Sequence, residues 1–92
     1  MNDLALTGRL DVHVAADVRL ALAEAVDAGF GELVVDLAGL EAVDATGLGV
    51  LVGAHRRAQR AGRTLVLEGV TAQVGRLLLV TRLDKVLHTR VA

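Results

Sequence analysis

The spacing of apolar residues changes repeatedly along this chain, and that alternation constrains the fold more than any other feature. Residues 33–37 and 64–68 are short runs rich in Val and Leu, as is typical of strands buried on both faces. Elsewhere, apolar residues recur every three or four positions, as they do along one side of a helix. Strands that alternate with helices favour parallel crossovers. We therefore expect an α/β domain with a mixed, mostly parallel β-sheet on which helices pack.

Local signals set the expected limits of the first elements. Residues 4–12 should form two short extended pieces around a turn at Gly8. Helical spacing predicts a first helix over residues 14–28 and a second over residues 46–61, each followed by a glycine that can end it. Residues 38–45 between the strand and the second helix are expected to form a loop.

The last third of the chain predicts a third helix and a final strand. Thr71 can cap a helix that carries Val74, Leu77 and Leu78 on one face, and residues 85–91 alternate as a weak edge strand would. No proline, repeat or low-complexity stretch divides the chain. We therefore expect residues 1–92 to form one domain, which has the size for a core but not for a deep substrate cleft as well.

The composition excludes several classes of function. The net charge of −1 gives no electrostatic attraction to nucleic acid, and one aromatic residue, Phe30, gives no platform for stacked bases. The absence of cysteine rules out disulfides and thiolate zinc sites. The three histidines are scattered, and His55, on the inner side of the second helix, is expected to be a hydrogen-bonded core residue. We expect no cofactor and no metal.

The sequence also contains no segment that targets the chain to a membrane. The longest apolar run falls far short of the ~20 residues that span a bilayer. The first residues do not resemble the basic start of a signal segment. We therefore expect a cytoplasmic protein without direct membrane insertion.

Residues 43–49, Val-Asp-Ala-Thr-Gly-Leu-Gly, are the best candidate for a functional site. Because the chain has no Ser or Tyr, its hydroxyl groups belong to threonines, and of these Thr46 alone is expected at a strand-to-helix turn beside an acid. Asp44 or Thr46 should cap the second helix. A phosphate on Thr46 would lie at the positive end of the helix dipole and would add about −1.5 to −2 charges beside Asp44.

The second helix is predicted to have two different faces. The side toward the sheet should carry Leu48, Leu51, Ala54, His55, Ala58 and Ala61. The outer side should carry Thr46, Gly49, Gly53, Arg56, Arg57 and Arg60. Each glycine inside a helix costs roughly 1 kcal/mol relative to alanine. The two outer glycines therefore indicate either close packing against a neighbouring loop or a flat surface on which another protein settles.

Five segments together resemble the STAS domain, the fold shared by bacterial anti-sigma factor antagonists and the cytoplasmic tails of sulfate transporters. These segments are residues 8–11, 33–37, 44–49, 61–65 and 83–86. The resemblance covers essentially the whole chain, in order and without large gaps. Two positions depart from the family pattern. Thr46 stands where many antagonists have Ser, and Arg82 stands where the family often has Gly; a left-handed turn at Arg82 would cost roughly 1 kcal/mol.

The resemblance implies partner switching. In such antagonists the residue at the position of Thr46 is phosphorylated by a serine/threonine kinase that is itself the anti-sigma factor. The unphosphorylated antagonist binds this kinase and frees the sigma factor, and a phosphatase resets the phosphorylated form. ATP and magnesium belong to the kinase, so this chain needs neither. Because the sequence also has no nucleophile, oxyanion loop or phosphate-binding glycine motif, we do not expect an enzyme. The implied partner-binding surface comprises Asp11, Asp44, Ala45, Thr46, Gly47, Gly49, Val50, Gly53 and Arg57.

Other interpretations stay open at this point. One is a constitutive STAS subunit of a stressosome or of a lipid-transport ABC complex, in which Thr46 is never modified. A receiver phosphorylated on Asp36 or Asp44 is a third. The arginines of the second helix and its end form either a solvated helix terminus or a rim that steers an acidic partner; they are Arg56, Arg57, Arg60 and Arg63. Homodimerisation through an edge strand or the glycine face is also open.

Overall fold

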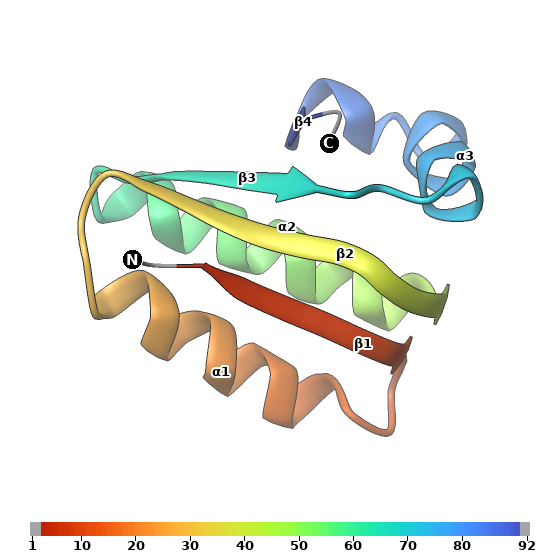
Figure 1. Cartoon of the computed structure of the whole chain (residues 1–92), viewed down its shortest axis with the longest axis horizontal. Coiled ribbons are helices and arrows are strands. Elements are labelled where there is room, and N and C mark those ends of the chain that lie inside the picture. Colours follow the sequence, from red (N-terminus) through yellow and green to blue (C-terminus); the bar gives the residue numbers. More distant parts are fainter. Residues whose placement is uncertain (1–2, 91–92) are drawn as a thin grey trace.

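The structure, a computed structural model, describes residues 3–90. Strands and helices alternate along these residues (Figure 1). In chain order they are β1 (Leu4–Leu10), α1 (Ala15–Asp27), β2 (Glu32–Val43), α2 (Ala45–Arg60), β3 (Thr64–Glu68), α3 (Ala72–Val80), the 3₁₀ turn η1 (Leu83–Lys85) and β4 (His88–Arg90).

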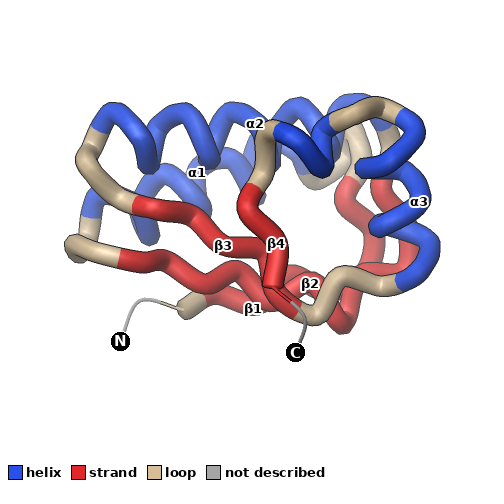
Figure 2. Tube along the Cα trace, turned by 90° about the horizontal axis from the view of Figure 1, so that it is seen from above, coloured by secondary structure: helices blue, strands red, loops and turns tan. Residues whose placement is uncertain are grey.

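The strands form one sheet in the order β1-β2-β3-β4, and each neighbouring pair is parallel. The expected α/β domain with a mostly parallel sheet is thus confirmed. Each strand lies next to the strand that precedes it in the chain, so the sheet grows in one direction from β1 to β4. Because crossover connections between parallel strands share one handedness, the connecting helices then lie on one face of the sheet. Figure 2 shows α1 and α2 side by side over that face, whereas the opposite face carries no helix.

The hydrophobic core lies between the sheet and the two long helices. Leu33, Val35 and Leu37 of β2 are fully buried there. The prediction that β2 is buried on both faces was wrong, because Asp36 is exposed and Val34 only half-buried. The same prediction holds better for β3, in which the three successive residues Leu65, Val66 and Leu67 are buried.

Two predicted boundaries at the sheet were wrong. Residues 38–43 are not a loop, because β2 continues to Val43 and pairs with β1 along the way, Leu10 lying opposite Val43. Residues 4–10 are one strand and not two, since Gly8, with φ of 74°, is accommodated as an irregularity of the β1–β2 register. Both errors have one cause: the pairing partner of each segment lies about thirty residues away in the chain.

The remaining elements follow the predictions closely. Both long helices begin and end within a residue or so of the expected positions. The Thr71 side chain accepts a hydrogen bond from the Val74 N–H (3.3 Å) and caps α3. Arg82 has φ of 61°, so the backbone is left-handed at this position, where the family often has glycine. The predicted edge strand is present as β4, although position 91 lies outside the described residues.

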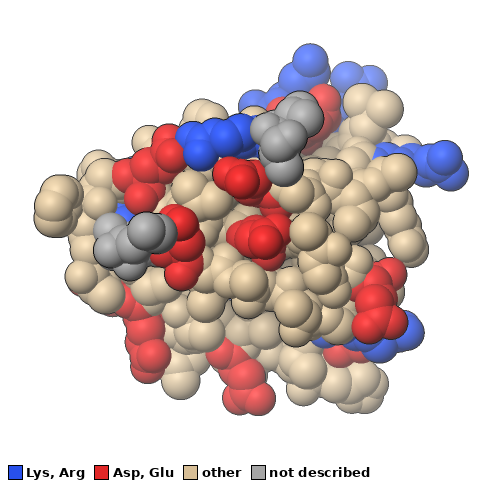
Figure 3. Space-filling view, viewed as in Figure 1, with Lys and Arg blue, Asp and Glu red and all other residues tan. Residues whose placement is uncertain are grey.

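The uncovered face of the sheet is charged. Figure 3 views the molecule from this side and shows acidic side chains gathered over the strands, with a basic side chain among them. Arg90 lies between two of these acids, at 2.5 Å from Glu32 and 3.5 Å from Glu68. These two pairs hold the guanidinium and raise the pKa of Arg90. The pairs also fasten the edge strand β4 to the middle of the sheet.

Candidate functional site

The site begins where Asp44 joins the end of β1 to the start of α2. One carboxylate oxygen of Asp44 accepts a hydrogen bond from the Gly47 N–H (2.8 Å), which makes Asp44 the N-cap. The other oxygen accepts one from the Val12 N–H (3.3 Å) in the loop between β1 and α1. The Asp44 N–H donates to the Leu10 carbonyl (3.2 Å). A single side chain thereby positions both segments that surround Thr46.

Gly47 brings the first turn of α2 against β1. A Cβ at this position would lie 2.2 Å from the Leu10 carbonyl oxygen and 2.9 Å from its Cγ, so no side chain fits without a backbone shift. Gly47 is accordingly buried. Packing against β1 therefore requires glycine at position 47. The close contact between the first turn of α2 and β1 also fixes the position of the preceding residue, Thr46.

Thr46 is the second residue of α2 and is exposed. The sequence left open which residue caps the helix, and Asp44 does so, which leaves the Thr46 side chain at the surface. The first N–H groups of a helix have no partner within it and carry partial positive charge. A hydroxyl here is accessible to another protein, and an anion attached to it would meet a favourable field.

The outer face of α2 is open, as predicted. Gly49 and Gly53 are exposed, and a Cβ at either position would have nothing within 4 Å. Close packing against a neighbouring loop, one of the two explanations offered for these glycines, is therefore wrong. The predicted inner residues are buried with the exception of Ala61, which lies beyond the end of the helix and is exposed. Val50, which was assigned to the partner-binding surface, is buried.

The acid at the start of the first loop lies at the same end of the molecule. Asp11 is half-buried, accepts a hydrogen bond from the His13 N–H (3.0 Å) and forms an ion pair with Arg9 (3.5 Å). It directly precedes Val12, whose N–H binds Asp44. Two carboxylates, those of Asp11 and Asp44, are thus held beside the start of α2.

The four arginines that the sequence grouped together have different surroundings. Arg57 forms a two-pronged ion pair with Asp27 of α1 (3.1 and 2.6 Å), which lowers the pKa of Asp27 and raises that of Arg57. Arg63 does not belong to a solvated cluster. It is only 4% exposed, and its guanidinium donates to the carbonyls of Ala25, Val26, Phe30, Gly31 and Glu32. It therefore caps the end of α1 from inside, a role for which the local sequence carries no signal.

His55 is buried in α2, as expected, but its ring is not fully hydrogen-bonded. Within the described residues Nδ1 has no partner, and the ring lies against His88 of β4 with 5.5 Å between centroids. Burial lowers the pKa of His55, and the neighbouring charges of His88 and Arg56 lower it further. The prediction of a hydrogen-bonded core histidine was wrong. The neighbour of the ring, His88, comes from a strand more than thirty residues further along the chain, so the sequence around His55 does not show which atoms lie near it.

Residues 3–90 contain no cluster of side chains suited to a metal ion. No group of three or more His, Cys, Asp or Glu is arranged to hold a metal. Asp36, one of the two acids weighed for a receiver, accepts a hydrogen bond from the Ala38 N–H (2.9 Å) at the uncovered face. No helix in this range is long and apolar enough to cross a membrane.

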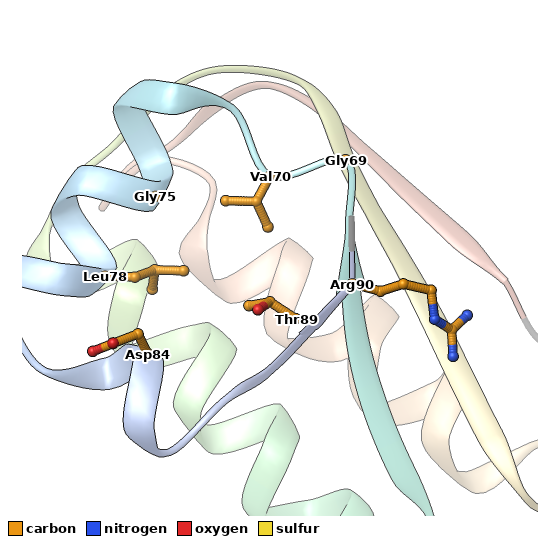
Figure 4. A pocket seen from close by; sticks show the side chains of 7 residues that line it. All are labelled: Gly69, Val70, Gly75, Leu78, Asp84, Thr89 and Arg90. Atoms are coloured by element: carbon orange, nitrogen blue, oxygen red, sulfur yellow. The ribbon is translucent and has the colours of Figure 1, made fainter. Parts of the chain in front are cut away.

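A hollow of about 440 Å³ is lined by elements other than α2. Figure 4 shows it between the turn after β3, α3, η1 and β4, with Val70, Leu78 and Thr89 facing its interior. The guanidinium of Arg90 points away from it toward the sheet. This hollow therefore brings together no set of reactive groups.

The candidate site is thus a capped helix start with an exposed hydroxyl, on a small α/β domain whose sheet is covered by helices on one face. The sequence pattern of the family described as "Mlab, STAS domain" matches residues 2–89. An anti-sigma-B factor antagonist of Staphylococcus epidermidis is 31% identical over 81 residues, which are 88% of this chain and 75% of the relative. The chain therefore belongs to the STAS domain family.

Solved structures share the fold. A putative anti-sigma factor antagonist from Thermotoga maritima matches with a TM-score of 0.84 and 20% identity, covering 99% of this chain and 80% of the other. The anti-sigma factor antagonist SpoIIAA in its unphosphorylated form matches with 0.72 and 17%, covering 99% and 81%. A sulfate transporter family protein from Wolinella succinogenes matches with 0.79 and 18%, covering 95% and 72%.

Proposed function

We propose that this protein is an anti-sigma factor antagonist that binds an anti-sigma factor kinase and is switched off by phosphorylation of Thr46. The observation that carries the proposal is the exposure of Thr46 on the first turn of α2, directly between the cap residue Asp44 and the buried Gly47. The curated relative that is an anti-sigma-B factor antagonist supports the same role.

The local contacts explain how a phosphate could act as a switch without unfolding the domain. Thr46 is exposed, so a phosphate there displaces no core residue. The free N–H groups and the dipole of the first turn favour its charge. It would add about −1.5 to −2 charges beside the carboxylates of Asp11 and Asp44. A partner that docks on the unmodified surface would then meet a concentrated negative charge and dissociate.

The resulting cycle has three states. The unmodified protein binds the kinase in the cytoplasm and thereby releases the sigma factor. The kinase transfers a phosphoryl group to Thr46, and the modified protein leaves. A phosphatase removes the group and restores binding. The protein itself supplies a positioned acceptor and a docking surface, and the kinase supplies the nucleotide and the metal.

The experiment is to incubate the protein with the anti-sigma factor kinase of the same genome and Mg-ATP and to measure its intact mass. We expect a gain of one phosphoryl group in the wild type and none in Thr46→Ala. Thr64→Ala, which removes an exposed hydroxyl from β3, is the matched control and should gain the group. No gain in the wild type, or an equal gain in Thr46→Ala, contradicts the proposal. A gain that hydroxylamine removes would indicate an aspartyl phosphate.

A second candidate is a constitutive STAS subunit of a larger assembly, such as a stressosome or a lipid-transport ABC complex. The observation in its favour is that the same fold occurs in a sulfate transporter family protein. In that role Thr46 is a contact residue and is never modified. An assembly that forms equally well with the wild type and with Thr46→Ser, and that no kinase alters, would support this second candidate.

A further inference from the structure

A groove of about 200 Å³ runs between α1 and α2 and has basic walls. Its walls carry Arg19 of α1 with Arg57 and Arg60 of α2, and its floor is made of small residues, Ala23, Gly53 and Ala54. No acidic residue lines it. A cationic groove with a shallow, side-chain-poor floor is suited to an anionic segment that comes close to the helix backbone.

The fold neutralises only part of this positive charge. Arg57 is bound to Asp27, which lies two turns beyond Arg19 on α1. Arg19 and Arg60 form no ion pair with any acid in residues 3–90. On the opposite side of the molecule, by contrast, Arg90 is held by two glutamates. The groove therefore retains two positive charges that the domain itself leaves without a carboxylate.

The floor of the groove carries an unexplained glycine. Gly53 lies in the interior of α2, where glycine costs about 1 kcal/mol relative to alanine. Nothing in the fold requires this residue, because a Cβ there would have no neighbour within 4 Å. The open space over Gly53 is the space that a bound segment would fill.

The groove and the site at Thr46 lie along the same side of α2. Thr46, Gly49, Gly53, Arg57 and Arg60 follow one another at intervals of three or four residues and so lie along one side of α2. At 1.5 Å per residue they span about 21 Å. Thr46 stands about 10 Å from Gly53 along the axis, which exceeds the screening length of about 8 Å at physiological salt. A charge on Thr46 therefore acts mainly on the part of a bound partner that lies over the first turn of α2.

We propose that the partner docks an acidic segment, with Asp or Glu side chains directed at Arg19 and Arg60, into the groove between α1 and α2. This inference rests on the proposed function and identifies the chemistry of the partner surface. The phosphate on Thr46 covers the start of α2, and it repels only that part of the partner that reaches the first turn of the helix.

The first test measures the affinity of the anti-sigma factor kinase of the same genome for a double variant, Arg19→Glu with Arg60→Glu. We expect binding to weaken roughly tenfold or more, with a smaller dependence on salt than in the wild type. The control is Arg76→Glu, which makes on α3 the two-unit charge change that the double variant makes at each of its two sites, and it should bind as the wild type does. Arg57 is left intact because its pair with Asp27 joins the two helices. Thermal unfolding verifies that each variant is folded.

The second test needs no kinase and separates the two proposals. An oligo-glutamate peptide is titrated at low ionic strength while amide NMR shifts are recorded. We expect the shifts to concentrate at Gly53 and along the facing side of α1, and to disappear in the double variant but not in Arg76→Glu. Shifts that are absent, or spread evenly over all basic residues, overturn the groove proposal.

The combined outcomes are unambiguous. Kinase binding that the double variant leaves unchanged refutes the acidic segment and leaves the switch at Thr46 standing. If the kinase does not bind the wild type, the proposed function fails, and the peptide titration alone decides whether the groove binds acidic segments.

Discussion

Replacing Gly49 and Gly53 together by alanine is expected to stabilise the domain and to weaken its binding to the partner. Both residues lie inside α2, and the Cβ added at each has nothing within 4 Å. The change therefore brings the helix propensity of alanine without a clash, worth about 1 kcal/mol at each position. Because the two added Cβ atoms have no common neighbour, the two gains in the free energy of unfolding should add to about 2 kcal/mol.

The predicted gain is large enough to measure in a domain of this size. At about 4–8 °C per kcal/mol, the double variant should melt about 8–16 °C above the wild type. Urea unfolding followed by far-ultraviolet circular dichroism should give the same increase in the free energy of unfolding with an unchanged slope. Gly47→Ala is the matched control in the same helix. Its Cβ would lie 2.2 Å from the Leu10 carbonyl oxygen, so it should destabilise the domain by about 1–3 kcal/mol.

The binding measurement tests why the glycines are there. Two methyl groups on the outer face of α2 hold a docked surface away from the helix backbone, so affinity for the kinase should fall even though the domain is more stable. A double variant that is no more stable than the wild type refutes the claim that these glycines cost the fold free energy. A variant that is more stable and binds equally well refutes their role in docking.

Four further substitutions test other contacts. Asp44→Ala removes the cap of α2 and the bond to the Val12 N–H, and urea unfolding should show a loss of about 1–2 kcal/mol; an unchanged midpoint contradicts the capping role. Arg82→Gly removes the cost of a side chain at a φ of 61° and should raise the free energy of unfolding by about 1 kcal/mol. A variant no more stable than the wild type contradicts a left-handed backbone at this position. Arg63→Met leaves buried carbonyls at the end of α1 without a donor and should destabilise the domain by about 2–4 kcal/mol, whereas a near-neutral effect would show that water replaces the guanidinium. Because His55 has a lowered pKa in the folded state, the unfolded chain binds more protons, so stability should fall as the pH drops through about 6.5, the ordinary value, toward the folded-state pKa. His55→Leu should flatten that dependence, and a profile identical to the wild type would assign it to other groups.

Much of the site could be predicted because its determinants are local in the sequence. The two faces of α2 follow from the period of the helix, and a cap at Asp44 or Thr46 follows from the position of these residues just before the helix. The structure decided between the two in favour of Asp44. The family pattern marked position 82 as one where a left-handed turn can occur, and the structure has that turn at Arg82. The predicted lengths of β1 and β2 were wrong. Residues 38–43 are extended because they pair with β1, including Gly8 and Leu10, and these partners are distant in the sequence.

The sequence by itself determined the alternation of strands and helices, the composition of the core and the exposed position of Thr46, since each depends on residues within a few positions of one another. Only the tertiary structure decided which arginines are free to meet a partner. Arg63 is buried against the end of α1, Arg57 is bound to Asp27, and Arg19 joins Arg60 beside the groove. The physical reason is that a charge is satisfied by whatever group the fold brings within hydrogen-bond distance, and those groups come from elements about thirty or more residues apart.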